Sequence, residues 1–542
     1  MNRSLPRRWR TRAAVAVLAV GTLVLSACGS NTGGGANGPQ LRTVNPFGDN
    51  LTSEGTAKNG GTLILAEDRE IVSFDPTVQN SNMAALAVYD SLLKLDDKGI
   101  PQPYMAKSMD TIDNGTTWRM GLRPEVKFSD GTPLDAQAVI TNVQRHIDKK
   151  SSPSNRYAVV IASMRAVDPT TVEFTLKNPS GTFPQLFALP FSSGNLGTIV
   201  SPKALQEKGE AGIAKEPVGA GPFMFTSWVR DSKLTMTKNP NYWQQGLPHL
   251  DGLEFRPLPD TETRYASIEN GDVDVVFGGY HTELIRGLGN PNLKVYYGTG
   301  NGAEYIYFNQ KKAPFDDRRM REAVVRAIDL DALAASQYRG QMGRADGYFG
   351  DDTPYSTEQS RDAWPSFDLE KAKQLVADYK ASGGSATVQY KTTNAPNRVA
   401  FAEFLQAQLK AAGIDIDVQF YDLAQYSSSV VQSRDFQIAG WVGGPTDTPF
   451  PGAYNLFHSG GSTNYGDYSN PQVDAALDTA VSTTDPDELN KAYQQVQQLT
   501  NEDLAVAYYS RGYLSTIAKP EVKGMQRYLT RDTFFANMWL DR

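Results

Sequence analysis

The stretch FAEFLQAQLKAAGIDIDVQF, residues 401–420, indicates the fold class more clearly than any other part of the chain. Its first part repeats apolar residues at the spacing of a helix face: Phe401, Phe404, Leu405, Leu409 and Ala412. Gly413 follows at the position of a helix stop. The remainder alternates apolar with polar residues, as a half-buried strand does: Ile414, Ile416, Val418 and Phe420 are the apolar members. A helix that leads directly into such a strand is typical of an α/β fold.

The same two patterns recur along the chain. Alternating or short apolar runs predict strands at residues 62–66, 117–122, 126–128, 172–176, 253–258, 273–277 and 305–309. Helical spacing predicts helices at residues 83–93, 134–147, 261–269, 317–328 and 369–379, and another that begins at Asp485-Pro486. Asp317 and Asp368 stand where helix N-caps are expected. Strands followed by helices imply α/β lobes, and we find no internal repeat.

Length and charge narrow the class of protein. The chain has 542 residues, more than one hydrophobic core usually serves, so about two or three domains are expected. The formal net charge is −7, and an acidic surface argues against nucleic-acid binding. The four histidines are scattered without metal-ligand spacing, and no Gly-x-Ser-x-Gly motif occurs. We therefore expect no enzyme activity, no cofactor and no resident metal.

The N-terminal segment has the composition of an export signal. Five arginines and no acidic residue precede an apolar run, residues 13–25, that is too short to span a bilayer. The chain's only cysteine, Cys28, ends the sequence Leu25-Ser26-Ala27-Cys28, which resembles the lipobox of bacterial lipoproteins. A lone cysteine in an exported protein has no internal disulfide partner, which favours lipid attachment over an ordinary signal with a chance cysteine. Arg7-Arg8 leaves Sec and twin-arginine export both open.

The segment after Cys28 predicts a tether. Residues 28–57 are rich in Gly, Asn, Ser and Thr, and such a coil spans roughly 30 Å. We therefore expect residues 1–27 to be a cleaved signal and the folded part to be held at the outer face of a bacterial cell membrane.

Seven short blocks carry a resemblance to a known family. They occur at residues 113–123 (DNGTTWRMGLR), 126–134 (VKFSDGTPL), 217–223 (PVGAGPF), 239–243 (NPNYW), 307–309 (YFN), 314–323 (PFDDRRMREA) and 464–474 (NYGDYSNPQVD). In this order they resemble the extracytoplasmic solute-binding proteins of family 5, which serve peptide-type ABC transporters. The resemblance covers nearly the whole chain after residue 58.

The resemblance implies a two-lobed clamp of the type-II periplasmic binding protein kind, with an additional small subdomain. Lobe I would comprise residues 58–300 and 506–542, with residues 91–199 as the subdomain within it. Lobe II would comprise residues 301–505. The chain crossings near residues 300 and 505 would form the hinge, and a ligand that touches both lobes would favour the closed state.

The resemblance also suggests ligand-binding residues. Trp441 is similar in position to a tryptophan that faces the ligand, and a large rigid ring stacks on a solute at little entropic cost. Peptide binders of this family place an Asp three residues later, where Gly444 stands here, and the nearest acid is Asp447. Asp447 could pair with a ligand amine or serve as a turn acid, and Trp441 could instead pack in a core. Tyr454 and Tyr280 are further ligand contacts that the resemblance implies.

The predicted function is therefore capture of an oligopeptide or a similar solute for an ABC permease in the membrane. Lipidated Cys28 would provide the only membrane contact, and we expect a monomer with no nucleic-acid partner. The same clamp could instead bind an oligosaccharide or a metal chelate, or present its ligand to a signalling receptor. These alternatives share the fold and differ in the ligand or the partner.

Overall fold

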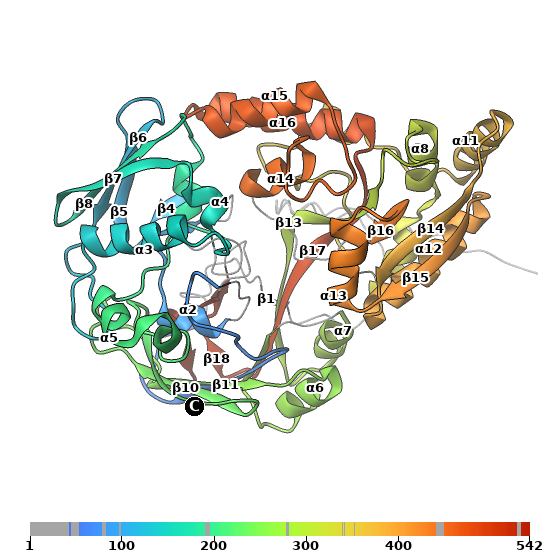
Figure 1. Ribbon diagram of the computed structural model, residues 1–542. Coiled ribbons are helices and arrows are strands. Elements are labelled where there is room, and N and C mark those ends of the chain that lie inside the picture. The colour runs from blue at the N-terminus through green and yellow to red at the C-terminus, as the bar shows by residue number, and fades with distance from the viewer. Residues whose placement is uncertain are drawn as a thin grey trace, which may run out of the picture. The chain divides into compact units, whose positions relative to one another are not determined.

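One mixed sheet organises most of the described chain (Figure 1). The computed structural model describes residues 43–44, 54–78, 83–96, 99–189, 196–277, 281–338, 340, 342–351, 353–440, 449–527 and 533–542. The sheet has 11 strands in the order β15-β14-β16-β13-β17-β12-β2-β11-β10-β9, with β1 beside β13. Their bounds are β1 Thr43–Val44, β2 Thr62–Glu67, β9 Phe223–Val229, β10 Lys233–Lys238, β11 Gly252–Pro257, β12 Val275–Phe277, β13 Lys294–Phe308, β14 Thr387–Thr393, β15 Asp415–Tyr421, β16 Ile438–Gly440 and β17 Val506–Ala518.

The long antiparallel pair β13–β17 joins two groups of strands. Its register runs from Lys294 opposite Ala518 to Tyr307 opposite Val506, with shifts after Thr299 and after Glu304. On one side β2, β11 and β12 are mutually parallel, and we call this group, with β9 and β10, the first half. On the other side β14 is parallel to β15 and to β16, and this group is the second half.

Helices begin where short acidic side chains can cap them. Asp260, Asp317, Asp368 and Asp485 each accept a backbone N–H of the first turn of their helix. These helices are α6 Thr261–Glu269, α8 Arg318–Ala327, α11 Leu369–Ala381 and α16 Pro486–Asp503. The stretch that indicated the fold class forms α12 Pro396–Ala411 and then β15, with Gly413 at φ +85° between them. The prediction of an α/β fold is confirmed.

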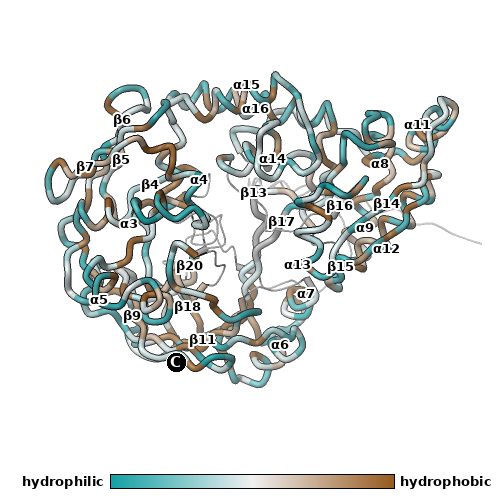
Figure 2. The backbone as a smooth tube through the Cα atoms, viewed as in Figure 1, coloured by the Kyte–Doolittle hydropathy of each residue, from teal (hydrophilic) through white to brown (hydrophobic). Residues whose placement is uncertain are grey.

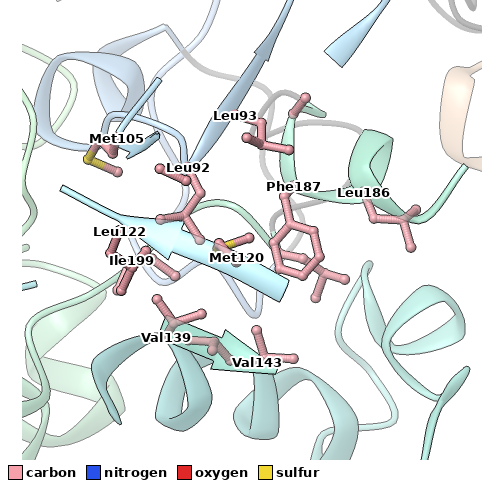
Figure 3. Packing of buried hydrophobic residues seen from close by; sticks show 14 of the residues in the cluster. Leu92, Leu93, Met105, Met120, Leu122, Val139, Val143, Leu186, Phe187 and Ile199 are labelled. Atoms are coloured by element: carbon pink, nitrogen blue, oxygen red, sulfur yellow. The ribbon is translucent and has the colours of Figure 1, made fainter. Parts of the chain in front are cut away.

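A separate four-stranded antiparallel sheet has its own hydrophobic core (Figure 3). Its order is β5-β6-β8-β7, with β5 Ala106–Thr111, β6 Thr117–Leu122, β7 Ile161–Asp168 and β8 Thr171–Leu176. Helix α3, Ala136–Asp148, packs on it through Val139 and Val143, and the short helix α4, Asn155–Ala158, follows. Because residues from Leu92 to Ile199 share this core, we call residues 92–199 the small subdomain.

The two halves of the large sheet pack separate cores. Leu65, Leu253 and Phe277 lie in the first, and Val388, Leu405 and Ile438 lie in the second. Figure 2 shows a hydrophobic segment at strand β16 and hydrophilic ones on many outer turns. No helix among the residues that the structure describes is long and apolar enough to cross a membrane.

The structure corrects some of the predicted element boundaries. The helix predicted over residues 83–93 ends at Val88, as α2 Ala84–Val88, because Tyr89 is extended and the Val88 carbonyl accepts the N–H of Gly221. Residues 126–128 form no strand and contribute only an isolated bridge, from Lys127 to Pro133. The strand predicted at residues 305–309 begins much earlier, at Lys294.

Three of the blocks that carried the family resemblance meet at one place. Ser129 donates its N–H to the Gly219 carbonyl. The side-chain amide of Asn241 donates to the Ser129 carbonyl at 3.2 Å. Asn239 donates its amide to the Gly221 carbonyl at 2.8 Å. A Cβ at Gly221 would lie 2.5 Å from the Val88 carbonyl oxygen, so this close approach requires glycine. The blocks at residues 126–134, 217–223 and 239–243 therefore build a joint of the scaffold.

Candidate functional site

The sheet topology indicates where a ligand would be held. In open α/β sheets, ligands bind beyond the carboxyl ends of parallel strands. In the second half β16 ends at Gly440, directly before Trp441, and in the first half β12 ends at Phe277, shortly before Tyr280. Trp441, Gly444, Asp447 and Tyr280 themselves lie outside the described residues, as does Cys28.

Tyr454 is the one predicted ligand residue that the structure describes. It begins α14, Tyr454–Phe457, and is half-buried. Its ring stacks on His458 with centroids 4.5 Å apart, and its hydroxyl donates to Asp478 Oδ1 at 3.3 Å. Burial, and then the charge of Asp478, raises the pKa of Tyr454 to about 12. The hydroxyl is therefore protonated at neutral pH, and its proton is donated to Asp478.

The carboxyl ends of β14 and β16 are fixed to each other by one tyrosine. The Tyr426 hydroxyl donates to the Lys391 carbonyl at 3.2 Å and also contacts the Gly440 carbonyl oxygen. Tyr426 is fully buried in the second half. The backbone that leads into Trp441 therefore starts from a rigid position.

Arg398 lies close to the same edge, in the first turn of α12. It donates to the Tyr509 hydroxyl at 2.7 Å, and its guanidinium is 3.6 Å from Glu304 Oε1. Glu304 belongs to β13 and Tyr509 to β17, so Arg398 connects the second half to both long strands. Burial opposes the charge on Arg398, but the Coulombic attraction of Tyr509 and Glu304 outweighs it and raises the pKa.

The carboxyl ends of β2 and β11 border a small concavity in the first half. It encloses about 250 Å³ including its open mouth, and its lining includes Glu67, Ile71, Trp228, Phe255 and Pro257. Glu67 is 5% exposed, and its Oε1 has no hydrogen-bond partner among the described residues. Burial, and then the neighbouring Asp68, raises the pKa of Glu67 to about 8. A neutral carboxylic acid therefore stands at this edge at neutral pH.

The described residues at the carboxyl ends of the strands, in both halves of the sheet, include group types suited to binding a solute. They comprise aromatic rings, tyrosine hydroxyls and a half-buried arginine, which are group types that stack on a solute or hydrogen-bond to it. Within the described ranges, no group of three or more His, Cys, Asp or Glu residues is placed to hold a metal ion.

Two described residues near the site were not identified from the sequence. Arg398 could have been found from the rule that the first turn of a helix after a parallel strand faces the ligand edge. Phe450, in η3 Pro449–Ala453, packs against the core of the small subdomain, which is remote in sequence. Nothing local to Phe450 signals that contact.

Comparison with known proteins identifies the family of the chain. Residues 101–464 match the family described as bacterial extracellular solute-binding proteins, family 5. The glutathione-binding protein GsiB of Salmonella paratyphi A is 30% identical over 455 residues, which cover 81% of this chain and 86% of GsiB.

Solved structures show the same fold. DppA of Helicobacter pylori, in complex with the peptide STSA, superposes with a TM-score of 0.73 at 24% identity, covering 90% of this chain and 99% of DppA. AppA of Bacillus subtilis, in complex with a nonapeptide, gives a TM-score of 0.71 at 22% identity, covering 90% of this chain and 100% of AppA. The fold is that of the type-II periplasmic binding proteins, as predicted. The chain therefore belongs to the bacterial extracellular solute-binding proteins of family 5, an extracytoplasmic group that binds solutes for ABC transporters and does not catalyse reactions.

Proposed function

We propose that this protein captures oligopeptides, or a peptide-like solute such as glutathione, and delivers them to an ABC permease. The observation that carries the proposal is the match to GsiB over 81% of the chain, together with the peptides held by DppA and AppA on the same fold. The acidic net charge of −7 and the described strand edges, with their rings and hydroxyls, are compatible with a small polar ligand.

The working parts would be two lobes and a hinge. We assign lobe I to residues 58–300 and 506–542, lobe II to residues 301–505, and the hinge to β13 and β17. The separate cores on the two sides of these strands support this division. A ligand that contacts both strand edges would stabilise the closed form by its differential affinity for that form.

The ligand would be held mainly by the segment that follows β16. Trp441 would stack on the ligand, and Asp447 would pair with an amine because Gly444 offers no carboxylate. Tyr454, with its protonated hydroxyl, and Tyr280, which follows β12, would contribute further contacts. A charged hydrogen bond contributes roughly 1.5–3 kcal/mol, so Asp447→Asn should weaken binding of a peptide with a free amine about tenfold or more.

Membrane anchoring would depend on Cys28. Its thiol would carry the lipid, and residues 28–57 would lead to the folded part. Cys28→Ser should release the protein from the membrane fraction of expressing bacteria and abolish incorporation of radiolabelled palmitate. Retention of the variant in the membrane would contradict lipid anchoring without affecting the proposal for the ligand.

Native mass spectrometry of the purified protein would test the ligand proposal directly. Co-purified short peptides, or saturable binding of glutathione or trialanine by calorimetry, would support it. A co-purified sugar or metal chelate, with no binding of either probe, would contradict it. Trp441→Ala should abolish the binding of the probe, whereas Trp441→Phe, as the matched control, should retain part of it.

A further inference from the structure

The small subdomain touches the second half at two places that are remote in sequence. The first lies between Gly181 and the turn after α15, Pro471–Ser482 (Figure 1). Gly181 donates its N–H to the Val481 carbonyl at 2.9 Å. The neighbouring loop is held beside Gly181, because Ser180 donates its N–H to the Gly115 carbonyl at 3.0 Å.

This first contact is too close for any side chain. A Cβ at Gly181 would lie 1.6 Å from the Thr483 carbonyl oxygen, and one at Gly115 would lie 3.2 Å from Thr484 Cγ2. The opposing turn is braced by its own bonds, because Thr483 Oγ1 donates to Glu488 at 2.5 Å and accepts the Asp485 N–H at 3.1 Å. These bonds restrain the turn, so it cannot easily shift to make room for a side chain at position 181.

The second contact joins α4 to the segment that follows residues 441–448. Arg156 donates to Ser462 Oγ at 3.1 Å, and the Tyr157 hydroxyl accepts a 3.4 Å hydrogen bond from the Asn455 amide. The Tyr157 ring meets Phe450 edge-on, with centroids 6.4 Å apart. The guanidinium of Arg156 lies over the Tyr157 ring at 4.7 Å, which fixes both side chains.

We call these two places together the seam: Gly115, Arg156, Tyr157 and Gly181 on the subdomain, and Phe450, Asn455, Ser462, Val481, Thr483 and Thr484 on the second half. The seam is small: apart from the ring contact of Tyr157 with Phe450 its bonds are polar, Arg156 and Ser462 are exposed, and Tyr157 and Gly115 are buried. Few and partly exposed bonds are characteristic of interfaces that separate and re-form.

We propose that the seam is a clasp that holds the closed state, so that the small subdomain sets how long a ligand is retained. The proposal rests on the proposed function, since it assumes that the two halves close on a solute. Closing the clasp forms the Gly181–Val481, Arg156–Ser462 and Asn455–Tyr157 bonds, and opening returns these groups to water. Because the clasp contacts add to those of the ligand, they lower the dissociation rate of any ligand that the closed state encloses.

Gly181→Ala is the sharpest test, because the three atoms nearest to the added methyl group are all backbone atoms across the seam. Glycine 181 has no left-handed φ, so alanine is tolerated by its own backbone. We expect about a tenfold faster dissociation of glutathione or trialanine, with an unchanged melting temperature of the unliganded protein. Gly289→Ala is the matched control, since a Cβ there meets nothing within 4 Å.

The paired variant Asn455→Ala with Ser462→Ala removes the polar bonds of the second contact without a collision. We expect the probe to dissociate from this variant severalfold faster than from wild type. That result would show that misfolding is not the cause of the Gly181→Ala effect. Normal dissociation rates in both variants would overturn the proposal.

Two readouts do not need a tight ligand. Hydrogen exchange of the Gly181 amide should be slow only when the seam is closed, and small-angle scattering should show a larger radius of gyration for Gly181→Ala than for wild type at saturating probe. Equal exchange in Gly181→Ala and wild type would overturn the clasp. If wild type binds neither probe, the peptide proposal fails, while the exchange comparison still decides whether the seam opens and closes.

Discussion

The small subdomain has two boundaries, and they are built differently. Its boundary with the first half is centred on Asp90, whose Oδ2 accepts the Tyr242 hydroxyl at 2.8 Å and the Trp243 indole N–H at 3.2 Å. Tyr104 of the subdomain completes this group, with its hydroxyl 3.3 Å from that of Tyr242 and its ring against Trp243 at 5.4 Å. We call Asp90, Tyr104, Tyr242 and Trp243 together the mount. The seam with the second half, by contrast, consists of a glycine contact, a few polar bonds and one edge-on ring contact between Tyr157 and Phe450.

The difference indicates which boundary is permanent. If the buried carboxyl group is separated from its aromatic donors, polar groups are left without hydrogen-bond partners. The free-energy cost of leaving them unsatisfied is larger than the net contribution of the hydrogen bonds themselves. The exposed partners at the seam exchange protein bonds for water bonds at little net cost. We therefore expect the subdomain to move together with the first half when the protein opens and closes. Its contacts with the second half would break and re-form.

The largest effect is expected from breaking the mount. Tyr242→Ala removes a buried ring and a donor to Asp90, so the free energy of unfolding should fall by about 3–5 kcal/mol in urea denaturation. Tyr242→Phe, which keeps the ring, should cost only about 1–3 kcal/mol. A Tyr242→Ala protein as stable as wild type would contradict the permanent role of the mount.

A second effect concerns the pH dependence of the mount. Burial raises the pKa of Asp90 from 3.8 to about 6, against the lowering effect of its hydrogen bonds from Tyr242 and Trp243. Between about pH 4 and 6 the folded protein keeps a proton that the unfolded chain has released. The free energy of unfolding should therefore decrease as pH rises through this window, by about 3 kcal/mol in total.

Asp90→Asn isolates that contribution. The amide oxygen still accepts from Tyr242 and does not titrate, so the variant should be more stable than wild type at pH 7.5 and match it near pH 4. Chemical denaturation at pH 4.5, 6.0 and 7.5 measures the difference. Parallel pH profiles for the two proteins would show that Asp90 does not titrate in this window.

A smaller effect is expected close to the seam on the second half. Tyr454→Phe deletes the hydroxyl that donates to Asp478, a largely exposed partner, and should lower the free energy of unfolding by about 0.5–1 kcal/mol. If Tyr454 also contacts the ligand through this hydroxyl, the dissociation constant for trialanine should rise severalfold. An unchanged constant would confine Tyr454 to the scaffold.

The smallest effect on stability is expected at the seam itself. Arg156 is exposed and donates a single bond to Ser462, so Arg156→Ala should change the free energy of unfolding by less than about 0.5 kcal/mol. Its dissociation rate for trialanine should nevertheless increase. A loss of stability comparable to that of Tyr242→Ala would show that the two boundaries are equally permanent.

Local sequence patterns predicted those elements whose causes are local. The helix face, the glycine stop and the alternating strand of residues 401–420 correspond to α12 and β15, and the Asp317, Asp368 and Asp485 caps lie where short acidic residues precede helical spacing. The end of α2 was missed because Gly221, more than 130 residues away, takes the Val88 carbonyl. The true length of β13 was missed because its glycine-rich middle, residues 298–302, has no strand pattern, whereas the pairs with β17 lie on both sides of a register shift between Thr299 and Ala303.

The candidate site was predictable only in part for the same reason. The predicted ligand residues Tyr280 and Trp441 follow β12 and β16 in the sequence, and ligands of open α/β sheets bind beyond the carboxyl ends of parallel strands. The contacts of Tyr157 with Asn455 and of Gly181 with Val481 join positions about 300 residues apart. No periodicity or short motif encodes such a pair, since it depends on how two separately folded parts meet.

The place where the leading chain joins the body has a mechanical consequence. Glu54 is held by Lys294 at 2.6 Å and by the Gly524 N–H at 2.7 Å, and Thr43 and Val44, within the range expected for the tether, pair with β13 at Val295 and Tyr296. Tension carried by the residues before Glu54 would therefore enter the molecule at one of the two strands that connect the halves. Under the proposed anchoring through Cys28, this tension would act at the proposed hinge and would exert almost no torque on either lobe, so it would neither open nor close the protein.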